Sequence, residues 1–275
     1  MHCTVCAHEE NEVAFNARGF EVLVCGHCQF GQVNPLPTVE TLTKLYDSQE
    51  YFATHMHYDY ARITDGEVQK QVRMAGQLHG SIIGPYMNGA KSLLEIGPGG
   101  GFALKHFEQR GLRVKGVETS DSSAAFMRER LGLEVDQALL ETYPLTEPAD
   151  VVMLNHVLEH FLDLRNAMER LRALVATGGL LYVRVPNHHS YDRRRMGASW
   201  PAYLPFHISY FSEASLRLLF AEYGFTVLKT SSFVSEQFLK NLPGPVRQLG
   251  IRALTFMGLQ NQFSGRTISI VGRKR

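Results

Sequence analysis

The stretch Leu93–Phe102 reads LLEIGPGGGF, an apolar strand that runs into a glycine-rich turn and then opens a helix. Glycine tolerates positive φ and lets a ligand approach the backbone closely. Dinucleotide-binding folds use the same kind of turn, so its glycines alone do not identify the ligand. Here Glu95 lies inside the strand and Pro98 inside the turn, whereas a phosphate-binding loop favours free amide donors with no carboxylate alongside. The pattern therefore predicts a ligand without phosphates.

Strands and helices alternate on the C-terminal side of this turn. Strands are predicted at 92–96, 113–118, 150–155, 180–185, 225–228 and 268–271, with a weaker one at 132–135. Helices are predicted at 102–110, 122–131, 164–175 and 213–223. Such alternation is typical of an α/β protein in which helices cover both faces of a parallel sheet.

Glu118 ends the second predicted strand, about 20 residues after the glycines. An acidic side chain at this place in a βαβ unit accepts hydrogen bonds from the two hydroxyls of a ribose. The alternative is a solvated glutamate at the end of a strand. The spacing favours the ribose contact.

Four segments, 93–101, 116–118, 150–160 and 177–187, together resemble class I S-adenosylmethionine-dependent methyltransferases. The resemblance covers about 91–275 and implies a Rossmann-like sheet of seven strands whose last strand is inserted antiparallel. It also implies that the cofactor is S-adenosylmethionine, whose sulfonium carries the methyl group to be transferred.

The same resemblance implies which residues contact each part of the cofactor. The methionine part lies on the turn, the ribose at the second strand, the adenine after the weak third strand and the sulfonium after the fourth. The residues are Glu95, Gly97, Gly99 and Gly101 for the methionine part, Glu118 for the ribose, Asp136 and Gln137 for the adenine, and Asn155 and His156 for the sulfonium.

All four cysteines lie in the first 28 residues, as two C-x2-C pairs separated by eighteen residues. Cys3, Cys6, Cys25 and Cys28 thus have the spacing of a zinc site closed by four thiolates, which is a structural rather than a catalytic site. A redox site is the alternative, but neither pair precedes an obvious helix. A ribbon this small needs its metal to fold.

Three regions follow from these patterns: a zinc ribbon at 1–34, a helical cap or lid at 35–90 and the methyltransferase core at 91–275. A double C-x2-C ahead of such a core resembles the zinc-containing methyltransferases of sugars and secondary metabolites. The resemblance implies that His207 is a catalytic base, although Phe206 stands where that family has a glutamate. The alternative is a histidine that binds a backbone carbonyl of its own loop.

The acceptor is expected between the cap and the loop at 187–212. Aromatic and imidazole side chains in these two segments are the candidate substrate-binding residues: Tyr51, Tyr58, His188, Trp200 and Tyr203.

Composition limits the partners. The 275 residues carry 28 basic and 27 acidic side chains, a formal charge of +1, which argues against charge-driven binding of nucleic acid or membrane. No apolar stretch is long enough to span a membrane and no secretory leader is visible, so the cytoplasm is the expected location.

A small-molecule methyltransferase is the leading hypothesis, acting on a hydroxyl, amine or enolisable carbon. The first alternative is an RNA base methyltransferase that grips RNA with its zinc module, but Arg18 is the module's one basic residue among several glutamates. The second alternative is a non-catalytic scaffold, against which the intact glycine turn and Glu118 argue. The oligomeric state is left open.

Overall fold

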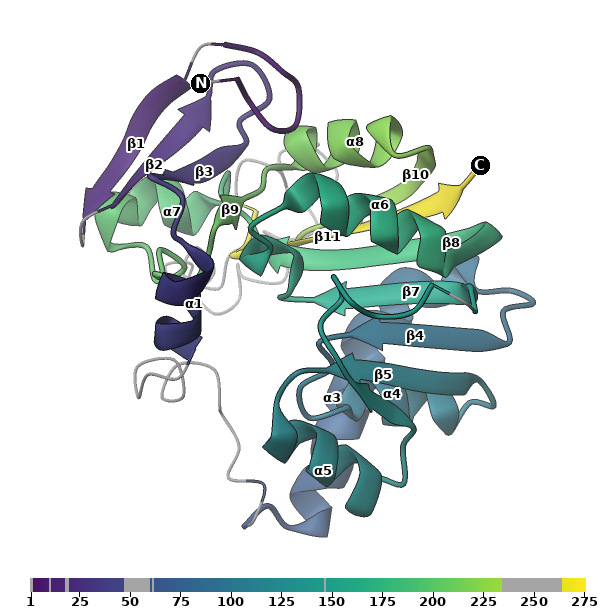
Figure 1. The fold of residues 1–275 in the computed structure, drawn as a ribbon. Helices are drawn as coiled ribbons and strands as arrows, with labels where there is room; N and C mark the ends of the chain where they lie inside the picture. Colours follow the sequence, from purple (N-terminus) through teal and green to yellow (C-terminus); the bar gives the residue numbers. More distant parts are fainter. Residues whose placement is uncertain are drawn as a thin grey trace, which may run out of the picture.

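A computed structural model describes residues 2–9, 11–17, 20–46, 60, 62–145, 147–233 and 264–275 (Figure 1). Its central element is a seven-stranded sheet with the strand order β10-β11-β8-β7-β4-β5-β6. The strands are β4 (Ser92–Ile96), β5 (Arg113–Glu118), β6 (Val135–Gln137), β7 (Ala149–Asn155), β8 (Val175–Pro186), β10 (Phe225–Ser231) and β11 (Thr267–Lys274). Strands β4 to β8 are parallel, and β11 lies antiparallel between β8 and β10. The predicted Rossmann-like sheet of seven strands is confirmed.

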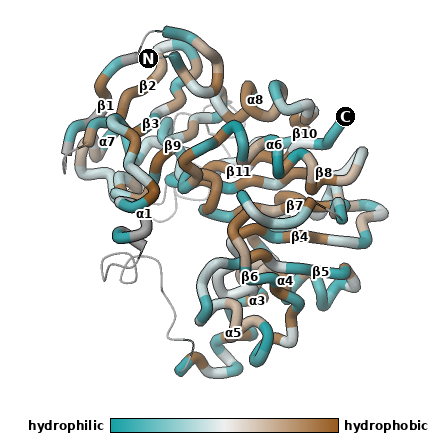
Figure 2. The backbone as a smooth tube through the Cα atoms, viewed as in Figure 1, coloured by the Kyte–Doolittle hydropathy of each residue, from teal (hydrophilic) through white to brown (hydrophobic). Residues whose placement is uncertain are grey.

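Helices cover both faces of this sheet because its central strands are apolar on both sides. One face packs against α6 (Leu164–Leu174) and α8 (Glu213–Glu222), and the other against α3 (Asp65–Ile83), α4 (Phe102–Glu108) and α5 (Asp121–Glu129). Figure 2 shows apolar residues concentrated in the central strands. No helix among the described residues is both long and apolar enough to cross a bilayer.

Two strands begin three or more residues away from their predicted starts. The weak third strand begins at Val135 rather than at Gly132, because Gly132 has φ +67° and forms the turn after α5. Strand β8 begins at Val175, five residues before its predicted start, because the chain passes from α6 directly into extended backbone.

The predicted cap contains α1 (Val39–Tyr46), α3 and the 3-10 turn η1 (Gly84–Tyr86). Helix α3 packs against α4 and shares its apolar cluster, so this helix is a layer of the core. Residues 47–59 lie outside the described part of the chain, and with them the candidate substrate residues Tyr51 and Tyr58.

The N-terminal module forms a second sheet with the order β1-β2-β3-β9. Strands β1 (Asn11–Ala17), β2 (Phe20–Cys25) and β3 (Gly31–Asn34) come from the module itself. Strand β9 (Ser209–Tyr210) comes from the segment between β8 and α8, which also contains α7 (Tyr191–Met196) and the 3-10 turn η3 (Gly197–Ser199). Figure 1 shows the module at the β9 and α7 end of the large sheet. A strand of the core thus completes the sheet of the cysteine module.

Candidate cofactor and acceptor site

The turn after β4 is held open by three glycines with positive φ: Gly97 at +63°, Gly99 at +56° and Gly101 at +66°. A Cβ on Gly97 or Gly101 would lie 2.6 Å from a side-chain atom of Val157 or Met127. A Cβ on Gly99 would have no atom of the described residues within 4 Å. The two outer glycines are therefore required by packing, whereas Gly99 faces open space that a ligand can fill.

Glu118 ties the end of β5 to this turn. The Gly99 amide donates to its Oε2 at 2.9 Å, and the Thr119 and Ser120 amides donate to its Oε1 at 2.8 and 2.9 Å. The carboxylate is 7% exposed. It lies at the carboxyl end of its strand, where an acid binds ribose hydroxyls in open α/β sheets.

Glu95 is buried behind the turn, and its Oε2 has no hydrogen-bond partner among the described residues. Burial, together with the charge of Glu118, raises the pKa of Glu95 to about 8. A buried carboxylate oxygen without a partner is costly unless a donor or a cation meets it. The ammonium group of a methionine ligand has the charge and the hydrogens to do so, and these residues therefore fit S-adenosylmethionine.

The predicted adenine contacts lie at the edge strand β6. Asp136 forms a 2.8 Å ion pair with Lys115 of the neighbouring strand. The amide of Gln137 donates to Asp121 at the start of α5. Both side chains thus have partners within the protein, at the same edge of the sheet as Glu118.

Asn155 ends β7 and His156 follows it, and Arg184 of β8 binds both. Arg184 Nη1 donates to Asn155 Oδ1 at 3.2 Å and to His156 Nε2 at 3.0 Å. His156 Nδ1 in turn donates to Oε1 of the fully buried Glu159 at 3.2 Å. His156 also has φ +58°, a strained conformation for a residue other than glycine. The imidazole thus bridges a guanidinium and a carboxylate.

Sequence reasoning missed Arg184 and Glu159. Arg184 is the one charged residue in the apolar run Leu180–Val185. A lone cation near the carboxyl end of a buried strand is the feature by which it could have been found.

His207 lies in the loop before β9 and is 5% exposed. Its Nδ1 donates to the Ala202 carbonyl at 2.8 Å. Burial, and then the neighbouring His160, lower the pKa of His207 to about 3. The ring is therefore neutral near pH 7, with Nε2 as its basic nitrogen.

Three of the other candidate acceptor residues, His188, Trp200 and Tyr203, form one aromatic cluster. His188 Nε2 and Tyr203 Oη lie 3.0 Å apart, and the Trp200 and Tyr203 rings meet edge to face. Trp200 and Tyr203 pack with Val22 and Val33 of the cysteine module in one buried cluster. A cavity of about 230 Å³ borders this cluster at His188 and is also lined by residues of the module.

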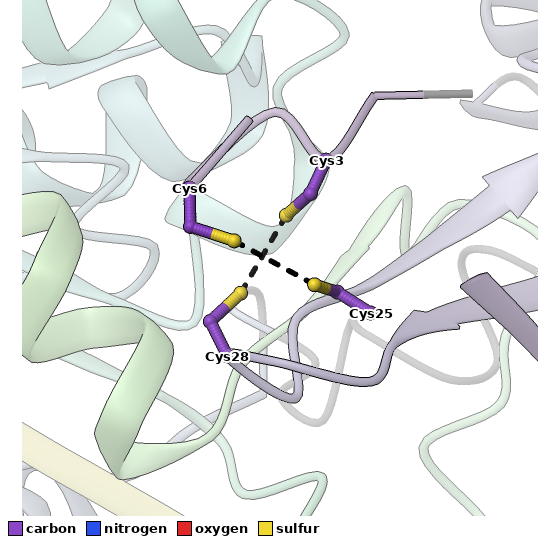
Figure 3. Close-up of side chains that lie close together, drawn as sticks. All are labelled: Cys3, Cys6, Cys25 and Cys28. Atoms are coloured by element: carbon purple, nitrogen blue, oxygen red, sulfur yellow. Dashed lines mark hydrogen bonds between the residues drawn. The ribbon is translucent and has the colours of Figure 1, made fainter. Parts of the chain in front are cut away.

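The four cysteines converge at the base of the module (Figure 3). The Sγ atoms of Cys3 and Cys28 are 3.5 Å apart, and those of Cys6 and Cys25 are 3.6 Å apart. Tetrahedral zinc with bonds of about 2.3 Å places its thiolates about 3.8 Å apart. The spacing therefore fits zinc and is far too long for a disulfide, whose sulfurs are about 2.05 Å apart.

The two C-x2-C turns repeat the same backbone pattern. The Cys3 amide donates to the His8 carbonyl and the Cys25 amide to that of Phe30, both at 2.8 Å. In each turn the amide four residues after the first cysteine donates back to that cysteine's carbonyl at 2.9 Å. Those residues, Ala7 and Gln29, both have positive φ. Each turn therefore presents its two thiolates in the same way.

Residues 54–230 match a family described as "Methyltransferase domain". The chain belongs to this methyltransferase family. The prediction of an S-adenosylmethionine-dependent methyltransferase is thereby confirmed at the level of the family.

Solved methyltransferases share the fold at low identity. One is the 1,6-didemethyltoxoflavin-N1-methyltransferase of Burkholderia thailandensis, with a TM-score of 0.56 and 15% identity over 97% of this chain and 99% of that one. Another is an S-adenosylmethionine-dependent methyltransferase of Archaeoglobus fulgidus, with a TM-score of 0.56 and 18% identity over 74% of this chain and 94% of that one.

A curated relative is the ubiquinone biosynthesis O-methyltransferase of Azoarcus sp. (strain BH72). It is 30% identical over 106 residues, which make up 36% of this chain and 46% of the relative. The match thus spans less than half the length of that relative.

Proposed function

We propose that this methyltransferase transfers the methyl group of S-adenosylmethionine to a small-molecule acceptor, at the carboxyl edge of the large sheet. The observation that carries the proposal is the open space at Gly99 together with the buried carboxyl group of Glu95, whose Oε2 has no hydrogen-bond partner among the described residues. Two relatives support the choice of a small acceptor, because one is named for ubiquinone biosynthesis and the other for didemethyltoxoflavin.

The cofactor, when bound, supplies a methyl group already activated by a sulfonium. The chain's own residues bind and orient it: the glycine turn and Glu95 hold the methionine part, and Glu118 holds the ribose. Asp136 and Gln137 are the proposed residues beside the adenine, and Asn155 and His156 those nearest the sulfonium. Catalysis then depends on aligning the acceptor with the methyl group.

His207 is the proposed group on the acceptor side. Its ring is neutral, and the Ala202 carbonyl fixes the proton on Nδ1. Nε2 therefore keeps a lone pair that can accept an acceptor proton or bind an electrophile. His188, Trp200 and Tyr203, together with Tyr51 and Tyr58, are the proposed walls of the acceptor site.

We also propose that Cys3, Cys6, Cys25 and Cys28 hold a structural zinc ion. The sulfur distances and the two matching turns support this assignment. Four thiolates leave no position open for a substrate.

Calorimetry with S-adenosylmethionine and its demethylated product tests the cofactor. Transfer of a radiolabelled methyl group to phenols, amines and nucleotide sugars then tests the acceptor. Binding of both cofactor forms and methylation of at least one small molecule are expected. Absence of binding would overturn the proposal, and methylation of bulk RNA alone would replace the small-molecule acceptor with RNA.

A further inference from the structure

Polar side chains form a row near the carboxyl edge of the large sheet, on the face that α3 covers. Met153 and Tyr182 belong to the apolar cluster of this face, and alternate residues of a strand share a face. Toward the carboxyl ends of their strands, the same face carries Glu95 of β4, Asn155 of β7 and Arg184 of β8. Arg184 is the cation of this row.

Arg184 lies beyond Asn155 as counted from the glycine turn. The turn follows β4, whereas β8 is two strands away from β4, with β7 between them. Arg184 pairs in register with Asn155 at the end of β7. In the proposed function Asn155 and His156 are nearest the sulfonium, so Arg184 lies on the acceptor's side of the methyl group.

Helix α3 covers the neighbouring Tyr182 but leaves Arg184 partly exposed. His79 of α3 and Tyr182 Oη form a 3.0 Å hydrogen bond, and both residues are buried. Arg184, two residues further along β8, is half-buried. Its guanidinium therefore lies where the buried face of the sheet opens to solvent.

Three neutral groups hold this guanidinium in place. Nη1 donates to Asn155 Oδ1 and to His156 Nε2, and Nη2 donates to Thr267 Oγ1 at 2.8 Å. A guanidinium has five N–H groups, so one on Nη2 and the one on Nε are left. Nε and Nη2 are neighbours on one edge of the planar group, and such an edge binds both oxygens of a carboxylate.

Solvent reaches this edge. Within the described part of the chain, Arg184 Nε has no hydrogen bond, and it is not one of the buried polar atoms that lack a partner. An atom that is neither hydrogen-bonded nor buried is accessible. A ligand at the carboxyl edge of the sheet can therefore contact Nε.

The charge of Arg184 has no direct counter-ion among the described residues. The acidic group linked to it is Glu159 of the 3-10 turn η2 (Leu158–His160), which it reaches only through His156. Burial lowers the pKa of Arg184, yet a guanidinium stays charged near pH 7. The Nε and Nη2 edge thus presents a fixed positive charge that a bound anion would neutralise.

We propose that the Nε and Nη2 edge of Arg184 binds a carboxylate of the acceptor, so that the acceptor is an anionic small molecule. One positive charge matches one carboxylate, whereas a phosphate monoester carries about two negative charges. The inference rests on the proposed function, because it places the acceptor beside Asn155 and His156. Two parallel hydrogen bonds would also fix the acceptor's orientation, on which methyl transfer depends.

The competing source of a carboxylate is the methionine part of the cofactor. Its ammonium group is proposed to meet Glu95 on β4, and β8 is two strands away from β4. The neighbouring strand β7 and the proposed sulfonium contacts lie between them. The position of Arg184 therefore favours the acceptor.

NMR titrations of the full chain with benzoate and with benzamide test the proposal, both with and without bound S-adenosylhomocysteine. The two probes share a ring and a size, but only benzoate carries a carboxylate. Benzoate should bind at least about tenfold more tightly than benzamide. Equal affinities for the two probes would overturn the proposal.

Variants then assign the preference to Arg184. Arg184→Gln should abolish it and change the affinity for S-adenosylhomocysteine by less than about twofold. Arg170→Gln is the matched control, because Arg170 is also half-buried and also donates to neutral groups, the carbonyls of Leu140 and Tyr143. It should retain the preference.

Two results with folded Arg184→Gln would overturn the proposal. An unchanged preference for benzoate would place the probe elsewhere on the protein. A loss of at least about tenfold in affinity for S-adenosylhomocysteine would assign Arg184 to the cofactor's own carboxylate.

Thr267→Val provides a second variant that keeps the positive charge. It removes the hydroxyl that holds Nη2, so benzoate should bind at least about threefold more weakly while benzamide binding is unchanged. Unchanged benzoate binding would contradict the role of a fixed guanidinium. The comparison of the two probes on the wild type needs no variant, so the proposal stays testable even if both variants fail to fold.

The two proposals fail separately. Binding of S-adenosylmethionine without a preference for benzoate would remove the carboxylate site and leave methyl transfer standing. A preference for benzoate that depends on Arg184, without any binding of S-adenosylmethionine, would do the reverse.

Discussion

The amide of Val33 donates a 3.1 Å hydrogen bond to the carbonyl of Ile208, and the amide of Ile208 donates to the carbonyl of Glu159 at 2.8 Å. Strand β3 of the cysteine module is thus linked through one residue to η2, next to His207. The Ser212 hydroxyl adds a second link, a 3.0 Å hydrogen bond to the Cys28 carbonyl. The cysteine module is therefore joined by hydrogen bonds to the proposed acceptor side of the site.

Loss of the proposed zinc ion should consequently impair methyl transfer more than cofactor binding. Cys25→Ser removes one thiolate, and we expect zinc loss, a turnover at least about tenfold lower and nearly unchanged affinity for S-adenosylmethionine. Zinc analysis, calorimetry and a turnover assay on one preparation measure all three. His27→Ala is the control, because His27 is exposed within the same C-x2-C turn. Full turnover in zinc-free Cys25→Ser protein would show that the module does not position the site.

The buried carboxyl of Glu95 should make stability depend on pH. Its pKa is raised from 4.5 to about 8 in the folded chain, so the folded state holds a proton that the unfolded state has released. The free energy of unfolding should therefore fall as pH rises from about 4.5 to about 8, by at most about 1.4 kcal/mol per pH unit. Urea denaturation across this range should show a shallower fall in Glu95→Gln.

The proposed role of Glu95 gives this prediction a second readout. A bound ammonium group would favour the ionised carboxylate, so binding of S-adenosylmethionine near pH 7 should release up to about one proton. Calorimetry in two buffers with different ionisation enthalpies measures that release. Equal proton release by the wild type and Glu95→Gln would contradict the assignment.

The open space at Gly99 predicts a variant that folds but binds cofactor poorly. Gly99→Ala places a methyl group where no atom of the described part of the chain lies within 4 Å, so the expected cost to folding is that of the positive φ, about 1–2 kcal/mol. If the cofactor fills that space, affinity for S-adenosylmethionine should fall by at least about tenfold.

Gly89→Ala is the matched control for this variant. Gly89 also has positive φ and open space around its Cβ position, but it precedes β4 and lies outside the proposed site. A similar loss of stability with unchanged cofactor affinity is expected. Equal affinity in Gly99→Ala and Gly89→Ala would show that the ligand does not approach Gly99.

The sheet and the glycine turn could be predicted because their patterns are local. Apolar strands such as Leu93–Ile96 alternate with amphipathic helices. The positive φ at Gly97 and Gly101 favours glycine, and glycines are visible directly in the sequence. The pairing of β9 with β3 could not be foreseen, because Ser209–Tyr210 forms only two residues of strand and its partner lies more than 170 positions away. Hydrogen bonds between strands so far apart in the sequence leave no local sequence pattern by which they could be predicted.

The Arg184–His156–Glu159 bridge was missed for a related reason. Its three members come from β8, the end of β7 and η2, and only the parallel pairing of Asn155 with Arg184 brings them together. The resemblance over 150–160 implied that His156 lies beside the sulfonium, but it did not identify Arg184 as the partner of that histidine. His207 was predicted from a resemblance, whereas its neighbours Glu159 and His160 became visible as one cluster only in three dimensions.

The bridge also makes a prediction about stability. Arg184→Met leaves Glu159 without a compensating charge, and we expect the free energy of unfolding to fall by about 2–4 kcal/mol. This is less than breaking a fully buried ion pair costs, because Arg184 is only half-buried. Glu159→Gln should destabilise as well, but the double variant should lose less than the sum of the two. A coupling energy of at least about 1 kcal/mol is expected from urea denaturation of all four proteins.

His156→Asn tests whether the imidazole carries this coupling, since asparagine tolerates the positive φ at this position. In that background the cycle between Arg184 and Glu159 should approach additivity, because no side chain then joins guanidinium to carboxylate. The exposed pair Arg130 and Asp65, whose atoms lie 2.7 Å apart, serves as a reference that should show almost no coupling. A coupling that survives His156→Asn would mean that Arg184 and Glu159 interact through the field of the site rather than through the imidazole bridge.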